Sequence, residues 1–195
     1  MKKCITTVYY LIDNFCKIYQ EYERNRLIPS SNQRNRDGKL SLAELLTIVI
    51  YFYLSPCKDF KNYYLYYLHY KYKGYFCLPS YSRIIQLWHI ILLPLAALMH
   101  YLKGEETDIY YIDSTKLAIC HNKRTSSNRV FNRISKIGKS SYGWFLGFKL
   151  HLVINNKGEI MSVKSTKGNK SDLSIASVIS QGLSGKLFAD KALHI

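Results

Sequence analysis

The chain has 195 residues, enough for one good-sized domain or for a small domain plus most of another. Hydrophobic residues make up 48% of the sequence and charged residues 21%, a composition that excludes an intrinsically disordered protein. The formal net charge of +15 comes from 28 Lys and Arg residues against 13 Asp and Glu residues, and it predicts a polyanionic partner, nucleic acid before an anionic membrane surface.

The cysteines and the apolar segments place limits on where the protein works. Five widely spaced cysteines form no CxxC pair, so we predict neither a disulfide framework nor a zinc site, and a reducing cytoplasm fits. Asp13 interrupts the apolar run near the N-terminus too early for a signal peptide. The most apolar segment, Ile84 to Met99, is shorter than the roughly 20 residues that a membrane-spanning helix needs. We expect it to be a buried helix of a cytoplasmic protein that does not span a membrane.

Helical spacing of apolar residues dominates the first hundred residues. The spacing from Val8 to Tyr19 predicts a first helix that runs to about Glu23. The polar, basic segment 24–39 reads as a loop. Ser41 and Glu44 form a capping-box pattern before a helix, 45–54, that is apolar almost all round and should lie at the centre of a bundle.

Two further helices are predicted before residue 103. The third carries an apolar stripe and ends near Gly74, and the fourth starts at Pro79-Ser80 and runs to about Leu102. The stripe consists of Phe60, Tyr63, Tyr64, Tyr67 and Leu68. The tyrosines and lysines of the third helix suit either a surface that faces DNA or, as we favour, inward tyrosines and solvated lysines. We therefore treat residues 1–103 as a helical region with possible DNA binding, although no recognition helix stands out.

The composition and the periodicity change at Gly104, which we take as the start of a second domain, 104–195. Residues 108–112 are mostly β-favouring and lead into Asp113, and we expect Ser114 and Thr115 to end this strand. A carboxylate at the edge of a buried strand is costly unless a cation meets it, and a divalent metal ion is the usual cation in enzymes that act on nucleic acids. The alternative is that Asp113 caps a turn.

A basic segment, 116–141, follows and contains no acidic residue. We interpret it as an insertion that draws in and holds phosphates, against the alternative of a solvated loop. Its cations are Lys116, Lys123, Arg124, Arg129, Arg133, Lys136 and Lys139.

The rest of the chain predicts two more strands, a helix and a last strand. Residues 144–154 alternate as a strand, the turn 155–158 leads to a partner strand 159–166, and Ser171 or Asp172 caps a helix 173–181. The last strand, 186–190, ends in Asp190. The predicted fold class is thus α/β, with a mixed sheet in the order strand-strand-strand-helix-strand. If the last strand lies parallel beside the first, Asp113 and Asp190 meet at one edge and could share two divalent cations about 4 Å apart. A turn at the end of the strand is the alternative for Asp190.

Five motifs together resemble bacterial insertion-sequence transposases. They are IDST at 112–115, CHNKR at 120–124, GWFLGFKLHLVINNKGEI at 143–160, KGN at 167–169 with Asp172, and FADK at 188–191. The resemblance is to the DDE type with a ribonuclease H-like catalytic domain, closest to the insertion-sequence nine-eighty-two family, and it extends to LSLAELLTIVI at 40–50 and LLPL at 92–95.

The resemblance implies a function and its residues. Asp113 and Asp190 match the first two acids of a catalytic triad that holds Mg²⁺, and the family cuts DNA at element ends and joins the 3′-hydroxyl to a target. DNA is then the partner, and a homo-oligomer is possible. We count Lys149 and His151 of the GFKLH motif among the DNA contacts, with the cations of the basic segment.

The sequence departs from the family pattern after Asp190. Family members continue with Asp-Lys-Gly-Tyr, a further strand and a helix that bears the catalytic Glu, whereas Ala192-Leu193-His194-Ile195 follows here. We therefore expect a C-terminally truncated transposase, with an incomplete sheet and one poorly covered sheet face. We also expect weak metal binding, little or no catalysis and marginal solubility. A non-enzymatic DNA-binding remnant, or an inhibitor of an intact transposase, is the alternative.

Overall fold

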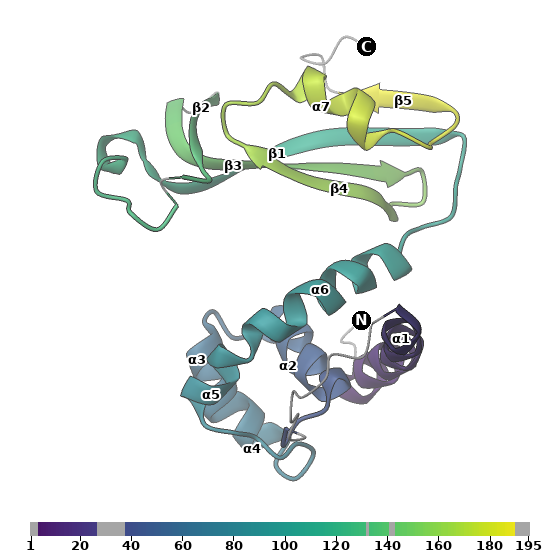
Figure 1. Ribbon diagram of the computed structural model, residues 1–195, viewed down its shortest axis with the longest axis vertical. Coiled ribbons are helices and arrows are strands. Elements are labelled where there is room, and N and C mark those ends of the chain that lie inside the picture. Colours follow the sequence, from purple (N-terminus) through teal and green to yellow (C-terminus); the bar gives the residue numbers. More distant parts are fainter. Residues whose placement is uncertain (1–3, 27–37, 132, 141–142, 190–195) are drawn as a thin grey trace. The chain divides into compact units, whose positions relative to one another are not determined.

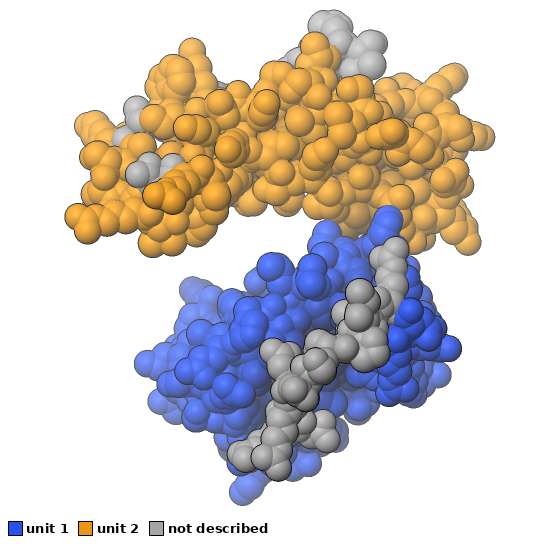
Figure 2. Space-filling view, viewed as in Figure 1, with its two compact units in different colours: residues 1–101 blue, residues 102–195 orange. Residues whose placement is uncertain are grey.

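The computed structural model describes residues 4–26, 38–131, 133–140 and 143–189. Two compact units divide the chain, Met1–Tyr101 and Leu102–Ile195 (Figure 2). The first unit is helical and the second contains a mixed sheet of five strands, so the predicted α/β class is confirmed. The boundary lies two residues before the one we predicted.

The helical unit contains helices in each of the four segments that the sequence predicts to be helical, with altered ends and with the fourth divided into two (Figure 1). They are α1 (Ile5–Arg26), α2 (Leu42–Leu54), the continuous stretch of α3 (Phe60–Asn62), η1 (Tyr63–Leu68) and α4 (His69–Lys71), then α5 (Tyr81–Gln86) and α6 (Trp88–Tyr101). The segment η1 is a π-helix, whose wider turn carries Tyr63, Tyr64 and Leu68 into the core. Most of the predicted 24–39 loop lies outside the described residues.

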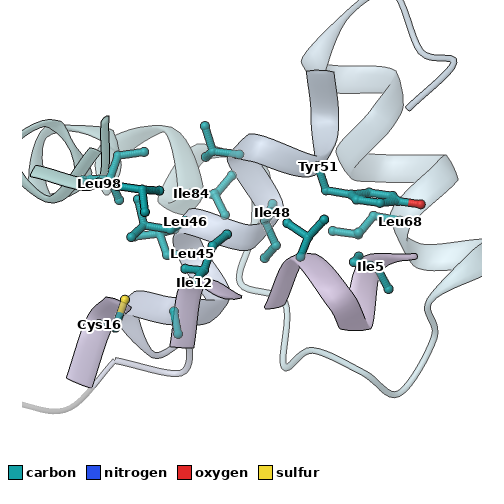
Figure 3. Close-up of a cluster of buried hydrophobic side chains, with 14 of the residues drawn as sticks. Ile5, Ile12, Cys16, Leu45, Leu46, Ile48, Tyr51, Leu68, Ile84 and Leu98 are labelled. Atoms are coloured by element: carbon teal, nitrogen blue, oxygen red, sulfur yellow. The ribbon is translucent and has the colours of Figure 1, made fainter. Parts of the chain in front are cut away.

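The helix α2 lies at the centre of this unit, as predicted. Its capping box is present, because the Glu44 amide donates to Ser41 Oγ (3.2 Å) and the Ser41 amide donates to Glu44 Oε2 (2.7 Å). Leu46 and Ile48 have no exposed surface, and they share one cluster of buried side chains with Ile12 of α1 (Figure 3). Burial on several sides of α2 is what its apolar sequence requires.

The prediction of one buried helix over Ile84 to Met99 is wrong. The helix is interrupted at Leu87, and α6 buries only one stripe, formed by Ile91, Pro94 and Leu98. The partly buried Leu95 and Ala97 also pack against the core, whereas Leu93 on the other side of α6 is 73% exposed. None of the helices among the described residues is long and apolar enough to cross a membrane.

The second unit is organised around one long strand. Its elements are β1 (Ile109–His121), the short 3₁₀ turn η2 (Asn122–Arg124), β2 (Lys136–Ser140), β3 (Gly143–Asn155), β4 (Ile160–Lys167), α7 (Asp172–Ile179) and β5 (Lys186–Ala189). Along one edge β3 pairs with β1, antiparallel, from Tyr110↔Asn155 to His121↔Phe145. Along its other edge the first half of β3 pairs with β2 and the second half with β4. On the far side of β1 lies β5, which runs parallel to it.

The two faces of this sheet are buried to different degrees. On one face α7 packs against the sheet and closes a core around Tyr110, Ile112, Val153 and Met161 (Figure 1). Alternate residues point to the opposite face, where Tyr111, Trp144 and Phe188 are 47%, 55% and 49% exposed. The aromatic side chains on this second face are therefore only partly buried.

Two predictions for the strands need correction. Ser114 and Thr115 do not end the first strand, which continues to His121 because β3 offers it a partner over its whole length. The basic segment is not a plain insertion, since its first residues extend β1 and its last residues form β2, so the sheet has one strand more than predicted. The turn after Asn155 is confirmed, and Ser171, not Asp172, is the N-cap of α7.

Three glycines lie where β2, β3 and β4 meet. A Cβ on Gly147 would lie 2.1 Å from the Leu117 carbonyl oxygen, and a Cβ on Gly138 would lie equally close to the Gly168 carbonyl oxygen. The Gly168 amide also donates to the Gly147 carbonyl at 3.0 Å. The glycines of the GFKLH and KGN motifs therefore have a packing role, because the backbones approach too closely for any side chain.

Candidate metal and nucleic-acid site

Asp113 lies in the middle of β1, between β3 and β5. In β3 it pairs with Leu152, which places its side chain on the half-exposed face with Tyr111 and Phe188. These two rings stack with centroids 5.8 Å apart, and with Asp113 they line a shallow hollow. The carboxylate is therefore exposed, and the burial cost that we inferred from the sequence does not arise.

The parallel pairing of β5 with β1 was the condition for bringing the two acids together, and this pairing is confirmed. The register runs from Ile109↔Lys186 to Ile112↔Ala189. Asp113 follows Ile112 in the sequence, and Asp190 follows Ala189. Asp190 itself lies outside the described residues.

The surroundings of Asp113 suit a hard cation that also has ligands from elsewhere. Its Oδ1 accepts a hydrogen bond from the Ser114 amide at 2.7 Å, and its other oxygen has no donor among the described residues. Mg²⁺ prefers oxygen ligands and is usually held by one or two carboxylates plus substrate phosphates. Across the described ranges, no group of three or more His, Cys, Asp or Glu side chains could hold a metal ion. What this part of the chain offers is thus one carboxylate, which fits such a site as a partial ligand set.

Lys149 and His151, predicted as DNA contacts, lie on the opposite face from Asp113. They pair with Lys116 and Ser114 of β1 and point towards α7. Lys149 Nζ donates to both carboxylate oxygens of Asp172, at 3.0 and 3.2 Å, while its side chain is only 16% exposed.

His151 is more deeply buried than Lys149, with 1% of its surface exposed. Its Nε2 lies 2.9 Å from Thr166 Oγ1, and its Nδ1 lies 3.8 Å from Asp172 Oδ1. Burial lowers the pKa of His151, which favours the neutral ring. These contacts attach α7 to the sheet and leave His151 no surface for DNA. The sequence analysis did not foresee this structural role of Lys149, His151 and Asp172. The sequence offered one signal for this cluster, namely an acid, Asp172, placed one turn before the buried residues of a predicted helix.

The cations of the basic segment behave differently, because all seven are exposed. Lys139 Nζ lies 5.8 Å from the centroid of the Trp144 ring, and Lys116 Nζ donates to Ser140 Oγ at 3.3 Å. Both contacts leave the positive charge at the surface of the β1–β2–β3 end of the sheet. This is the sheet end at the left of Figure 1, where the 3₁₀ turn η2 also carries Lys123 and Arg124.

Residues 103–194 match the family model described as "Transposase DDE domain". The match spans the sheet-bearing unit except its first and last residues, and it supports a DDE transposase and a role in DNA transposition. Transposases of this kind generally bind DNA and use a divalent metal ion. No curated protein and no solved structure matched the chain.

Proposed function

We propose that the sheet-bearing unit acts on DNA by metal-dependent phosphoryl transfer, with Asp113 and Asp190 as its metal ligands. The observation that carries the proposal is the β1–β5 register, which pairs Ile112, the residue before Asp113, with Ala189, the residue before Asp190. Because parallel strands advance together, Asp190 would continue the register beside Asp113.

The chemistry follows from this placement. A bound Mg²⁺ would supply activation of a water or a 3′-hydroxyl and stabilisation of the leaving oxygen at phosphorus. The chain's own residues would supply the carboxylates that hold the ion and the exposed cations that position the phosphate backbone. Of the predicted contacts we retain the seven cations of the basic segment, since their side chains reach the surface, and leave out Lys149 and His151. We also propose that the chain is related to the insertion-sequence nine-eighty-two family, which it resembles in its motifs.

Metal binding by the full chain tests the two carboxylates. We expect Mn²⁺, followed by electron paramagnetic resonance, to bind the wild-type chain, and Asp113→Asn and Asp190→Asn each to weaken this binding on the order of tenfold or more, since each removes an anionic ligand. Asp108→Asn is the matched control, because Asp108 is an exposed acid whose backbone carbonyl, not its side chain, bonds β5. Equal Mn²⁺ binding by all four proteins would overturn the assignment.

A DNA cleavage assay decides between the proposal and its alternative. Weak Mg²⁺-dependent nicking that disappears in Asp113→Asn would establish phosphoryl transfer at the low level that we expect from the sequence. DNA binding without such nicking would favour the non-enzymatic DNA-binding protein, which the seven exposed cations support on their own.

A further inference from the structure

The helical stretch Phe60–Lys71 carries tyrosines on both of its sides. Tyr63 and Tyr64 are fully buried, and the Tyr64 hydroxyl donates to the Pro79 carbonyl at 2.6 Å. Tyr67 is half-buried and stacks on Tyr63, with ring centroids 5.9 Å apart. Packing explains these three side chains.

Tyr66 and Tyr70 have no such explanation. They are 68% and 93% exposed, and they lie four residues apart, so they share one face of the helix. Among the described residues neither ring pairs with another aromatic side chain and neither hydroxyl has a hydrogen-bond partner. Two neighbouring aromatic rings held in solvent without internal contacts mark a surface that binds something.

The charged residues on and beside this stretch are almost all positive. The exposed residues Lys58, Lys61, Lys71 and Lys73 lie on or beside this stretch, against one acid, Asp59. Asp59 is occupied as the N-cap of α3, where it accepts from the Asn62 amide and side chain at 2.8 and 2.7 Å.

Lys71 contacts two other tyrosines in and next to this stretch. Its Nζ donates to the Tyr67 hydroxyl at 3.1 Å and lies 5.2 and 5.6 Å from the ring centroids of Tyr67 and Tyr72. The ammonium group is thus held against Tyr67 and Tyr72, and it has no carboxylate partner among the described residues.

We propose that this tyrosine–lysine face, defined by Tyr66, Tyr70 and the four lysines, binds single-stranded nucleic acid. Unpaired bases would stack on the two rings, while the lysines contact the phosphates. Duplex DNA offers the lysines the same phosphates but keeps its base faces stacked on one another, so it cannot use the tyrosines. An anionic membrane fits less well, because membrane-surface helices present Trp, Phe and Leu beside their lysines.

The test measures fluorescence anisotropy of labelled oligothymidylate, roughly 16 nucleotides long, with the full chain in metal-free buffer. We expect Tyr66→Ala and Tyr70→Ala each to weaken binding about tenfold, the loss of one stacked base, and to leave the affinity for a duplex of the same length unchanged. Tyr66→Phe and Tyr70→Phe keep the ring and should bind as the wild type does.

The controls separate this surface from others. Tyr10→Ala removes a 65% exposed tyrosine from α1 of the same unit and should leave oligothymidylate binding unchanged. Equal losses for single strand and duplex would overturn the proposal, as would Phe variants as weak as the Ala variants. The proposal would also be overturned if Tyr66→Ala and Tyr70→Ala lost binding to phosphatidylserine vesicles but bound oligothymidylate as the wild type does.

Discussion

Asp113 and His151 lie on opposite faces of one pair of strands, although both belong to motifs of the same resemblance. Asp113 pairs with Leu152, and His151 pairs with Ser114, so a shift of one residue along β3 changes the face. One face offers a carboxylate to solvent, and the other joins α7 to the sheet through Lys149, His151 and Asp172. The motif residues therefore divide into a candidate chemical set and a structural set.

The buried histidine gives the second unit a pH-dependent stability. Desolvation lowers the pKa of His151 below its ordinary value of 6.5, and Lys149 and Lys164 act in the same direction, while Asp172 opposes them. As the pH falls, the unfolded chain takes up the proton first, so the free energy of unfolding decreases from about pH 6.5 downwards and is fully regained above it.

His151→Gln tests this linkage. Glutamine can still bond Thr166 but does not titrate, so the melting temperature of the variant should fall less between about pH 7.5 and pH 5 than that of the wild type. His100→Gln, which alters an exposed histidine of the helical unit, should follow the wild type. Parallel pH profiles for wild type and His151→Gln would contradict the shift.

At the scale of elements, the close approach of β3 to β1 at Gly147 depends on the absence of a side chain. Gly147→Ala would bring a Cβ against the Leu117 carbonyl, and because both atoms are held by backbone pairing the strands must separate. We expect a loss of about 1–3 kcal/mol in the free energy of unfolding. Urea unfolding in a Trp88→Phe background measures it, since Trp144 then reports on the second unit.

Gly38→Ala is the matched control for this substitution. A Cβ there would meet its nearest backbone atom at 3.5 Å, an ordinary contact, and Gly38 lies in the helical unit. An unchanged urea midpoint for Gly147→Ala would show that the strands can relax around the methyl group.

The elements also show what the sequence could predict. The alternation of 144–154 and the Asn155 turn predicted β3 and its hairpin because local pattern and tertiary pairing agree there. The extension of β1 beyond Thr115 and the existence of β2 were missed, because polar and basic residues form these strands only through pairing with β3. The break at Leu87 was missed for a similar reason, since an apolar run contains no signal for which residues will face the core.

The candidate site was predicted in part. Asp113 lies on the predicted strand, and the parallel neighbour of that strand is confirmed, whereas the role of Asp113 as a metal ligand stays a prediction. Its exposure was not foreseen, because the apolar residues around it suggested burial while only one face of the sheet is covered by α7. The predictions of truncation, weak catalysis and marginal solubility stay predictions.

For the whole molecule, the net charge of +15 makes DNA affinity dependent on salt. The logarithm of the association constant for duplex DNA should fall linearly with the logarithm of the salt concentration, because bound cations release counterions. The double variant Lys123→Ala, Arg124→Ala should reduce the magnitude of this slope by roughly 2. Lys17→Ala removes an exposed lysine that is paired with Asp13 and should leave the slope unchanged. The same slope for both variants would exclude the η2 turn from the DNA interface.

The strand pairings of the second unit differ in how much chain separates the two strands, and this difference sets the order in which they form. The β2–β3 and β3–β4 pairings join strands that are close in the sequence, whereas β5 pairs with β1 across the longest stretch of chain, from Ile109 to Lys186. The pairing that brings Ala189 opposite Ile112 would accordingly form late, on a template that the other strands have already built. The position of the candidate metal site is then decided at the last step of folding.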